Sequence, residues 1–370
     1  MLTAYRLLLT AYCFLLSACC HAQPTKEDGE LKHKIAQMLM IGFRGMELKP
    51  TMTIYNDVKK LGIGGIILFD YDVPSKAYKR NISSPKQLKK LIADLQAVAP
   101  VKLLMAIDQE GGKVNRLKVR YGFPPTVSAQ YLGKLNSVDT TVKYAVATAK
   151  TLSNLGFNLN FAPAVDLNVN PDCPIIGKVE RSFSADVDVV VQQATIWLDE
   201  QQKQGVMGCI KHFPGHGSSA ADTHLGIADV SNSWTEQELA PFRQLIAEGR
   251  VDVVMTSHVY NRHLDEKYPA TMSKKIITGI LRDTLGFTGV VVTDDLAMGA
   301  LVEHYSFEEI LLKAIEAGAD VLCLSNNGKI YDDKIATKAV NIIYKAVKQG
   351  KITPERIEES YSRIIALREK

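Results

Sequence analysis

The sequence predicts an α/β fold, a single (β/α)8 barrel of the TIM type. Short apolar runs recur along the chain with amphipathic segments between them, and eight of these runs are strand-like. Most are continuously hydrophobic, as is typical of parallel strands that are buried on both faces. Eight strand–helix units in one domain favour a barrel. The competing fold is a doubly wound open sheet, but its nucleotide-binding spacings GxGxxG and GxxxxGK[ST] do not occur.

The expected elements follow one another without a break. The strands are Met38–Phe43, Gly65–Phe69, Leu103–Ile107, Asn158–Phe161, Val206–Ile210, Val253–Thr256, Val290–Thr293 and Val321–Leu324. Apolar residues at helical spacing predict helices between them. These helices include Pro85–Ala97, Ser137–Leu155, Asp186–Gln202, Glu236–Glu248, Lys275–Thr284, Asp332–Gln349 and Thr353–Glu369. No linker or change of composition marks a second domain, so one barrel is expected over residues 32–370.

Residues 1–18 are predicted to be a signal peptide of the lipoprotein type. Arg6 gives a positive amino-terminal region, and the apolar run Leu7–Leu16 is shorter than the roughly 20 residues that cross a bilayer. The following Leu16-Ser17-Ala18-Cys19 resembles the lipobox of bacterial lipoproteins, in which the cysteine becomes the lipidated first residue. The alternative is an ordinary secretory signal that is cleaved near Ala22.

Both alternatives make the chain an exported bacterial envelope protein. Lipidation at Cys19 would anchor it to a membrane, with the barrel in the periplasm or at the cell surface. The polar residues 19–31 would then form a tether between the lipid and the barrel. We expect contact with the membrane through this lipid anchor only.

Composition is ordinary for a soluble globular enzyme, with 46% hydrophobic and 23% charged residues. A net charge of +4 over 370 residues, without a lysine–arginine cluster, argues against nucleic acid as a partner. Beyond the signal region, Cys173, Cys209 and Cys323 are far apart and odd in number, so a disulfide framework is not expected. No cofactor is expected.

The most informative stretch is Lys211-His212-Phe213-Pro214-Gly215-His216-Gly217, followed by Asp222-Thr223-His224. It holds more titratable groups than a structural turn needs. Lys211 and His212 stand where an apolar strand leaves the core. Asp222 and His224 lie two residues apart in a glycine-rich loop, where the carboxylate can orient the imidazole and the loop can close over a ligand.

Further polar residues follow other strands, at the carboxyl ends of the strands, where barrel enzymes have their active sites. Asp108 and Arg116 follow the third strand, and a carboxylate there can accept hydrogen bonds from two neighbouring sugar hydroxyls. The paired Gly111 and Gly112 would let substrate approach the backbone. The alternative for this segment is the start of a helix, where the helix dipole favours acidic residues. His258 follows the sixth strand and is expected on the same face.

Two adjacent carboxylates, Asp294 and Asp295, follow the seventh strand. A strand alternates its side chains, so they cannot both point into the barrel mouth. We expect one to face substrate and the other to be held by hydrogen bonds beside it. The alternative is that both cap a helix starting near Leu296.

Four motifs together resemble glycoside hydrolase family 3, and more narrowly its β-N-acetylhexosaminidase branch. They are the blocks 211–217 and 222–224 already quoted, Ile107-Asp108-Gln109-Glu110-Gly111-Gly112 and Thr293-Asp294-Asp295-Leu296-Ala297-Met298. The resemblance runs from about Lys34 through nearly the whole mature chain. It implies a retaining exo-hydrolase that removes terminal N-acetylglucosamine from a carbohydrate substrate.

The resemblance also implies roles for individual residues. Asp294 matches the nucleophile, His224 the acid/base and Asp222 its paired aspartate. The residues that match those holding the terminal sugar are Asp108, Arg116, Arg181, Lys211 and His212. Two departures, Lys113 after the double glycine and Ser218-Ser219 after the histidine block, touch no catalytic position.

These roles agree with the chemistry of retention. A carboxylate forms the glycosyl-enzyme ester, and a second group first donates and later removes a proton. An imidazole with an ordinary pKa of about 6.5 can do both near neutrality.

Three alternatives stay open. His212, His216, His224 and Asp222 resemble a metal-ligand set, although Pro214 and Gly215 break any helix that would align the first two. Phosphorolysis is a closer alternative, because a neutral histidine repels phosphate less than a carboxylate does. A β-glucosidase of the same family is the third. The sequence identifies neither the natural aglycone, whether a muropeptide, a chitin oligomer or a host glycan, nor the oligomeric state.

Overall fold

Eight short parallel strands form the centre of the molecule. The computed structural model describes residues 26–370, so the expected signal peptide and Cys19 lie outside the described residues. In chain order the strands are β1 (Leu39–Gly42), β2 (Gly65–Ile67), β5 (Leu104–Ile107), β8 (Leu159–Asn160), β9 (Met207–Phe213), β11 (Val253–Thr256), β13 (Val290–Val292) and β14 (Leu322–Leu324). Strands that follow one another from β1 to β13 are paired, and β14 pairs with β1, which confirms the predicted barrel.

The barrel closes between its first and last strands, β1 and β14, and at a seam between β13 and β14. Leu39 pairs in register with Leu322 across β1 and β14. At the seam only an isolated bridge, Val292 with Val321, joins the two strands. A side chain replaces a backbone partner there, because the Cys323 amide donates to Thr293 Oγ1 at 2.9 Å.

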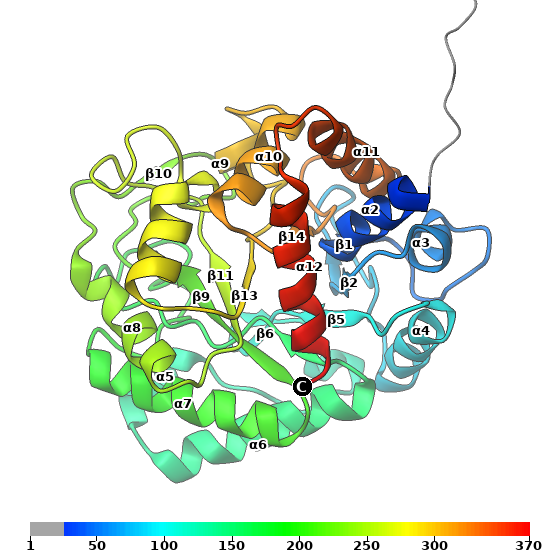
Figure 1. Cartoon of the computed structure of the whole chain (residues 1–370). Coiled ribbons are helices and arrows are strands. Elements are labelled where there is room, and N and C mark those ends of the chain that lie inside the picture. The colour runs from blue at the N-terminus through cyan, green and yellow to red at the C-terminus, as the bar shows by residue number, and fades with distance from the viewer. Residues whose placement is uncertain (1–25) are drawn as a thin grey trace, which may run out of the picture.

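Helices surround these strands (Figure 1). The longer ones are α2 (Lys26–Gln37), α4 (Pro85–Val98), α6 (Val138–Leu155), α7 (Val187–Lys203), α8 (Ala240–Ala247), the π-type η5 (Lys275–Thr284), α10 (Phe307–Ala317), α11 (Ile335–Lys348) and α12 (Pro354–Arg368). The helix expected over 236–248 is divided into a short η3 (Glu236–Leu239) and α8. Among residues 26–370 no helix is both long and apolar enough to span a membrane.

Shorter elements decorate the loops. The helical turns are α3 (Thr53–Asn56), η1 (Asp57–Leu61), η2 (Val119–Tyr121), α5 (Ala129–Leu135), η4 (Ala270–Met272) and α9 (Gly299–Val302). The small strand pairs are β3 (Tyr71–Asp72) with β4 (Ala77–Tyr78), β6 (Gln109–Gly111) with β7 (Val114–Asn115), and β10 (Ala228–Asp229) with β12 (Val259–Tyr260).

Local sequence explains where the helices begin. α4 starts at Pro85, whose missing N–H costs nothing at this position, and Ser84 Oγ accepts a hydrogen bond from the Gln87 amide at 3.2 Å. Its apolar residues Leu88, Leu91, Ile92 and Leu95 are buried against the barrel. Ser306 and Thr353 cap α10 and α12 in the same way.

The expected tether is wrong over residues 26–31, which form the first turns of α2. Asp28 accepts hydrogen bonds from the Tyr344 hydroxyl at 2.7 Å and from Lys348 at 3.0 Å, both on α11. Leu31 packs against the core. These contacts stabilise the polar residues 26–31 as a helix. Their low hydrophobicity alone did not indicate one.

The buried Asp320 joins the seam to the helices. Its Oδ2 accepts from the Val291 amide at 3.0 Å and from Arg282 at 2.6 Å. Its Oδ1 accepts from Ser360 of α12 at 2.8 Å and from Arg363 at 3.1 Å. The carboxylate therefore supports strand pairing and also balances arginine charges.

We predict that Asp320→Ala lowers the free energy of unfolding by about 3–5 kcal/mol, because it leaves buried guanidinium groups without a counter-charge. Urea denaturation measures the loss. The matched control is Glu359→Gln, which removes an exposed partner 3.5 Å from Arg356; it should cost less than about 1 kcal/mol. Equal losses for the two variants would contradict this account of Asp320.

Candidate active site

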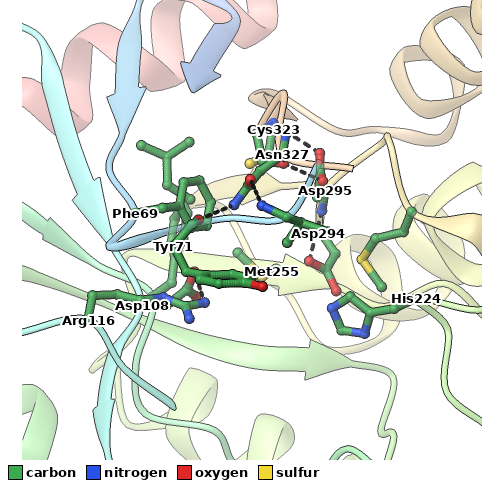
Figure 2. Close-up of a pocket in the computed structure, with 15 residues that line it drawn as sticks. Phe69, Tyr71, Asp108, Arg116, His224, Met255, Asp294, Asp295, Cys323 and Asn327 are labelled. Atoms are coloured by element: carbon green, nitrogen blue, oxygen red, sulfur yellow. Dashed lines mark hydrogen bonds and ion pairs between the residues drawn. The ribbon is translucent and has the colours of Figure 1, made fainter. Parts of the chain in front are cut away.

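A cavity of about 280 Å³ opens at the carboxyl ends of the barrel strands. Of the residues expected from the sequence, Asp108, Arg116, His224 and Asp294 line it. Figure 2 shows Asp108 and Arg116 on one side and Asp294 and His224 on the other. Segments far apart in the chain thus bring two carboxylates, a guanidinium and an imidazole to one cavity.

The two adjacent aspartates both line the cavity, but their carboxylates have different partners. Asp294 Oδ1 accepts the Asp295 amide at 2.8 Å. Asp295 is held by the Ala297 amide at 3.2 Å, the Ser325 amide at 2.9 Å and the Ser325 hydroxyl. The alternative of a helix cap is wrong, because the next helix, α9, begins at Gly299 and has no side-chain cap.

Electrostatics separates these two carboxyls as well. Burial would raise the pKa of Asp294, but the imidazoles of His258, His212 and His224 outweigh it and lower that pKa to about 2. For Asp295 burial prevails over the hydrogen bonds from Ser325 and raises the pKa. Asp294 is therefore the stronger acid of the two and is anionic at neutral pH.

Asp222 and His224 form the expected pair on the loop after β9. His224 Nδ1 lies 2.7 Å from Asp222 Oδ1, and the His224 amide donates to the same oxygen at 2.8 Å. This hydrogen bond raises the pKa of His224 and lowers that of Asp222. Because a carboxylate only accepts, Nδ1 carries a proton and Nε2 is left for a ligand. The His224 side chain is 61% exposed.

The loop is fixed on both sides of this pair. The Ala300 amide donates to the Thr223 carbonyl at 3.0 Å, and Thr223 Oγ1 lies 3.3 Å from Nε2 of the buried His216. Gly217 packs so closely that a Cβ would stand 1.7 Å from the Leu167 carbonyl oxygen. Only glycine fits at that position, which explains one glycine of the histidine block.

Lys211 connects the carboxylates behind the cavity. Its ammonium lies 2.9 Å from Asp108 Oδ1 and 2.6 Å from Glu110 Oε1, and its side chain is 2% exposed. Arg181 binds Glu110 through two hydrogen bonds of 2.8 and 2.7 Å. Burial would raise the pKa of Asp108, yet Lys211 and Arg116 together lower it. Asp108 is therefore presented to the cavity as a carboxylate.

His212 is oriented by a second buried carboxylate, Asp166. His212 Nδ1 lies 2.6 Å from Asp166 Oδ2, and Arg181 Nη2 lies 3.0 Å from His212 Nε2. Since a guanidinium only donates, Nε2 must accept and the proton sits on Nδ1. The His216 amide also donates to Asp166, at 2.8 Å.

His258 supports the segment of Asp294 and Asp295. Its Nε2 lies 2.9 Å from the Asp295 carbonyl oxygen and its Nδ1 lies 2.8 Å from Thr271 Oγ1. Burial lowers the pKa of His258 despite the opposing charge of Asp294. The neutral ring donates from Nε2 and holds the backbone at Asp295.

Arg181, Lys211, His212 and His258 do not line the cavity in this structure. Lys211 contacts Asp108, and His258 contacts the backbone of Asp295. Arg181 and His212 contact each other, and Arg181 reaches the cavity lining only through Glu110 and Lys211. Their expected direct contact with sugar stays a prediction, and the structure gives them a positioning role. β9 extends to Phe213, so Lys211 and His212 lie inside the strand rather than beyond its expected end at Ile210.

Two buried carboxylates of the site, Glu110 and Asp166, are not among the residues expected from the sequence. The alternation of Asp108-Gln109-Glu110 was a usable signal for Glu110, because it places residues 108 and 110 on the same side. Tyr71 and Asn327 also line the cavity, from loops that carry no recognisable motif.

The expected purpose of Gly111 and Gly112 is wrong. Neither glycine lines the cavity. Both have positive φ, and a Cβ on Gly111 would stand 2.3 Å from the Val127 carbonyl oxygen. The pair makes room for the neighbouring chain rather than for substrate.

The four metal-ligand candidates do not converge. His212 pairs with Asp166, His216 with Thr223, and His224 with Asp222. Within residues 26–370 no three His, Cys, Asp or Glu side chains form a group that could hold a metal ion.

Comparisons with known proteins identify the family of the chain. The model of the glycosyl hydrolase family 3 N-terminal domain matches residues 30–367. The chain is 36% identical to a beta-hexosaminidase of Mannheimia succiniciproducens, covering 78% of this chain and 80% of that protein. It is 31% identical to beta-hexosaminidase A of Pseudoalteromonas piscicida, covering 95% of this chain but spanning only 63% of that longer protein.

Solved structures show the same similarity. The family 3 β-N-acetylglucosaminidase of Paenibacillus sp. FPU-7 has a TM-score of 0.83 and 37% identity, over 92% of this chain and 62% of that one. The β-N-acetylhexosaminidase of Beutenbergia cavernae has a TM-score of 0.80 and 26% identity, over 91% of this chain and 97% of that one. The match over residues 30–367 and the shared barrel establish that the chain belongs to glycoside hydrolase family 3.

Proposed function

We propose that the protein is a β-N-acetylhexosaminidase, a retaining exo-glycosidase that hydrolyses terminal β-linked N-acetylglucosamine. One observation carries the proposal: an anionic Asp294 and His224, which is paired with Asp222, line one cavity at the carboxyl ends of the barrel strands. The names of the similar enzymes from Paenibacillus and Mannheimia support the choice of sugar.

Asp294 and His224 carry out the proposed reaction. His224 Nε2 donates a proton to the glycosidic oxygen while Asp294 forms an ester with the anomeric carbon and the aglycone leaves. His224 then removes a proton from water, whose oxygen attacks the anomeric carbon and releases Asp294. One water is consumed, and two inversions at carbon retain the configuration.

The cavity wall supports exo-action. Strand residues Met255 and Cys323, with Phe161, line its barrel side. Asp108, held by Lys211, and Arg116, which lies 3.6 Å from Asp108, offer an acceptor and donors for sugar hydroxyls. We propose that these two hold the terminal sugar, while Lys211, Arg181, His212 and His258 maintain their geometry.

A panel of chromogenic glycosides tests the proposal. The β-N-acetylglucosaminide should be hydrolysed far faster than the β-glucoside, at equal rates with and without phosphate and unaffected by chelator. Preference for glucoside would favour a β-glucosidase. Formation of sugar 1-phosphate would favour phosphorolysis, and loss of activity with chelator would favour a metal-dependent enzyme.

We predict that Asp294→Ala or Asp294→Asn lowers hydrolysis by several orders of magnitude while circular dichroism shows an intact fold. Without the carboxylate no glycosyl ester forms. A slow fluorinated sugar should label Asp294 in the wild-type protein, as read by peptide mass spectrometry. A label on Asp295 would refute the assignment.

We predict that His224→Ala slows substrates with poor leaving groups by about 10²–10⁴-fold but activated aryl glycosides much less, since only the former need a proton. Paired kcat/KM values measure the difference. Equal losses for both substrates would argue that His224 binds sugar instead.

Asp222→Ala should show the same dependence on the leaving group as His224→Ala, but more weakly. It should also change the pH dependence of kcat/KM. Because its hydrogen bond raises the pKa of His224, the variant should lower that pKa. The first step needs the protonated ring, so activity is lost as pH rises through this value. The alkaline limb of kcat/KM should therefore move to lower pH.

We also propose that the protein is a lipoprotein of the bacterial envelope, anchored at Cys19. The lipobox-like Leu16-Ser17-Ala18-Cys19 after a short apolar run supports this. Each buried CH₂ of an acyl chain contributes about 0.8 kcal/mol, and more than one chain is needed for stable anchoring.

Cys19→Ser should therefore release a soluble protein of unchanged activity or leave an uncleaved precursor, as membrane fractionation and mass spectrometry would show. A wild-type protein that fractionates as soluble, with an N-terminus beyond Ala22, would instead indicate plain secretion.

A further inference from the structure

An exposed aromatic surface continues from the cavity. The hairpin of β3 and β4 pairs Tyr71 with Tyr78, and their ring centroids lie 4.9 Å apart. Tyr71 and Val73 line the cavity, and in Figure 2 Tyr71 lies on the side of Asp108 and Arg116. Val73 is 49% exposed and Tyr78 is 55% exposed. The hairpin therefore extends the cavity wall outward.

Two cations lie on this surface. The Arg120 guanidinium is 3.9 Å from the centroid of the Tyr78 ring, and Lys118 Nζ is 5.2 Å from it. Both side chains stay accessible, at 48% and 32% exposure. The fully buried Asp70 lies 2.6 Å from Lys118 Nζ and 4.0 Å from Arg120 Nη2. One buried carboxylate thus faces two cations, which leaves a net positive charge.

The surrounding sequence does not neutralise that charge. Between Gly111 and Val138 there is no Asp or Glu, whereas five Lys and Arg residues occur. The hairpin's own acids, Asp70 and Asp72, are buried. No dense basic run marks this region, because Lys118 and Arg120 alternate with an apolar residue; the fold brings them together over Tyr78.

We propose that Tyr78, Arg120 and Lys118 bind the aglycone, and that the preferred aglycone is a sugar that carries an acid group. The inference rests on the proposed function. A substrate whose terminal sugar fills a cavity closed on the barrel side must extend through its mouth, past Tyr71 and Val73. There an aromatic ring offers a flat apolar surface for a sugar ring, and a guanidinium is suited to a carboxylate.

The test compares two disaccharides with N-acetylglucosamine at the non-reducing end. In one the second sugar carries a carboxylate, and in the other the same group is a neutral methyl amide. The wild-type enzyme should favour the acid in kcat/KM by about fivefold, a preference that falls as salt screens the charge. Arg120→Gln should bring the ratio close to one, and Arg120→Lys should retain part of it.

Two further variants separate charge from stacking. Tyr78→Ala should lower kcat/KM for both disaccharides and keep the wild-type order of preference, because stacking does not depend on the acid group. Lys134→Gln is the matched control: Lys134 belongs to the same acid-free segment but bonds to Gln130 on α5, at 3.1 Å. It should leave both rates and their ratio unchanged.

An acid-to-amide ratio of one in the wild type, or a ratio unaltered in Arg120→Gln, would overturn the inference. Should Arg120→Gln fail to fold, the salt dependence of the wild-type ratio decides, since a ratio that salt does not change excludes the charge contact. The two proposals fail differently. If the proposed function is wrong, neither disaccharide nor an aryl N-acetylglucosaminide is cleaved; if only this inference is wrong, both disaccharides are cleaved equally.

Discussion

The half of the site that contains Asp108 depends on the ion pairs of the Lys211 ammonium. This ammonium lies inside the barrel with almost no exposure and joins Asp108 to Glu110. Glu110 in turn binds Arg181, and Arg181 reaches His212. Each of these groups would be costly in an apolar interior, and only their mutual pairing makes the arrangement tolerable. Removing one partner typically costs about 3–5 kcal/mol, because a charge is left unpaired. The orientation of Asp108 is thus coupled to residues on three segments, around positions 110, 181 and 211–212.

The other half of the site combines a rigid element with an accessible one. Asp294 lies just after a barrel strand, and Asp295 beside it is held by His258 at its carbonyl oxygen and by Ser325 at its carboxylate. His224 stands on a loop with most of its side chain exposed, although Thr223 anchors that loop to α9. A fixed carboxylate suits attack at one carbon atom, where small displacements are expensive. An accessible imidazole suits proton delivery to leaving groups of different shapes.

Much of the barrel could be predicted because strands buried on both faces have continuous apolar runs. The end of β9 could not, since Lys211 and His212 are polar residues that are buried only because distant carboxylates pair with them. The same limit applies to residues 26–31, whose helix depends on partners on α11. The motifs identified Asp294, His224 and Asp222, and the structure brings Asp294 and His224 to one cavity, with Asp222 paired to His224. They assigned no role to Glu110, although its spacing from Asp108 was a usable signal, or to Asp166, whose role as a buried counter-charge has no sequence pattern of its own.

Barrel closure has a consequence for the order of folding. The first strand pairs with the last, so Leu39 meets a partner that lies about 280 residues further along the chain. A chain that emerges amino-terminus first cannot complete its sheet until residue 324 is free, and α2 must also wait for α11 and α12. Contacts of such long range slow folding and leave strand edges open in the meantime. For the proposed export this delay is an advantage, because a polypeptide that passes through a membrane as an extended thread must not have closed its barrel beforehand.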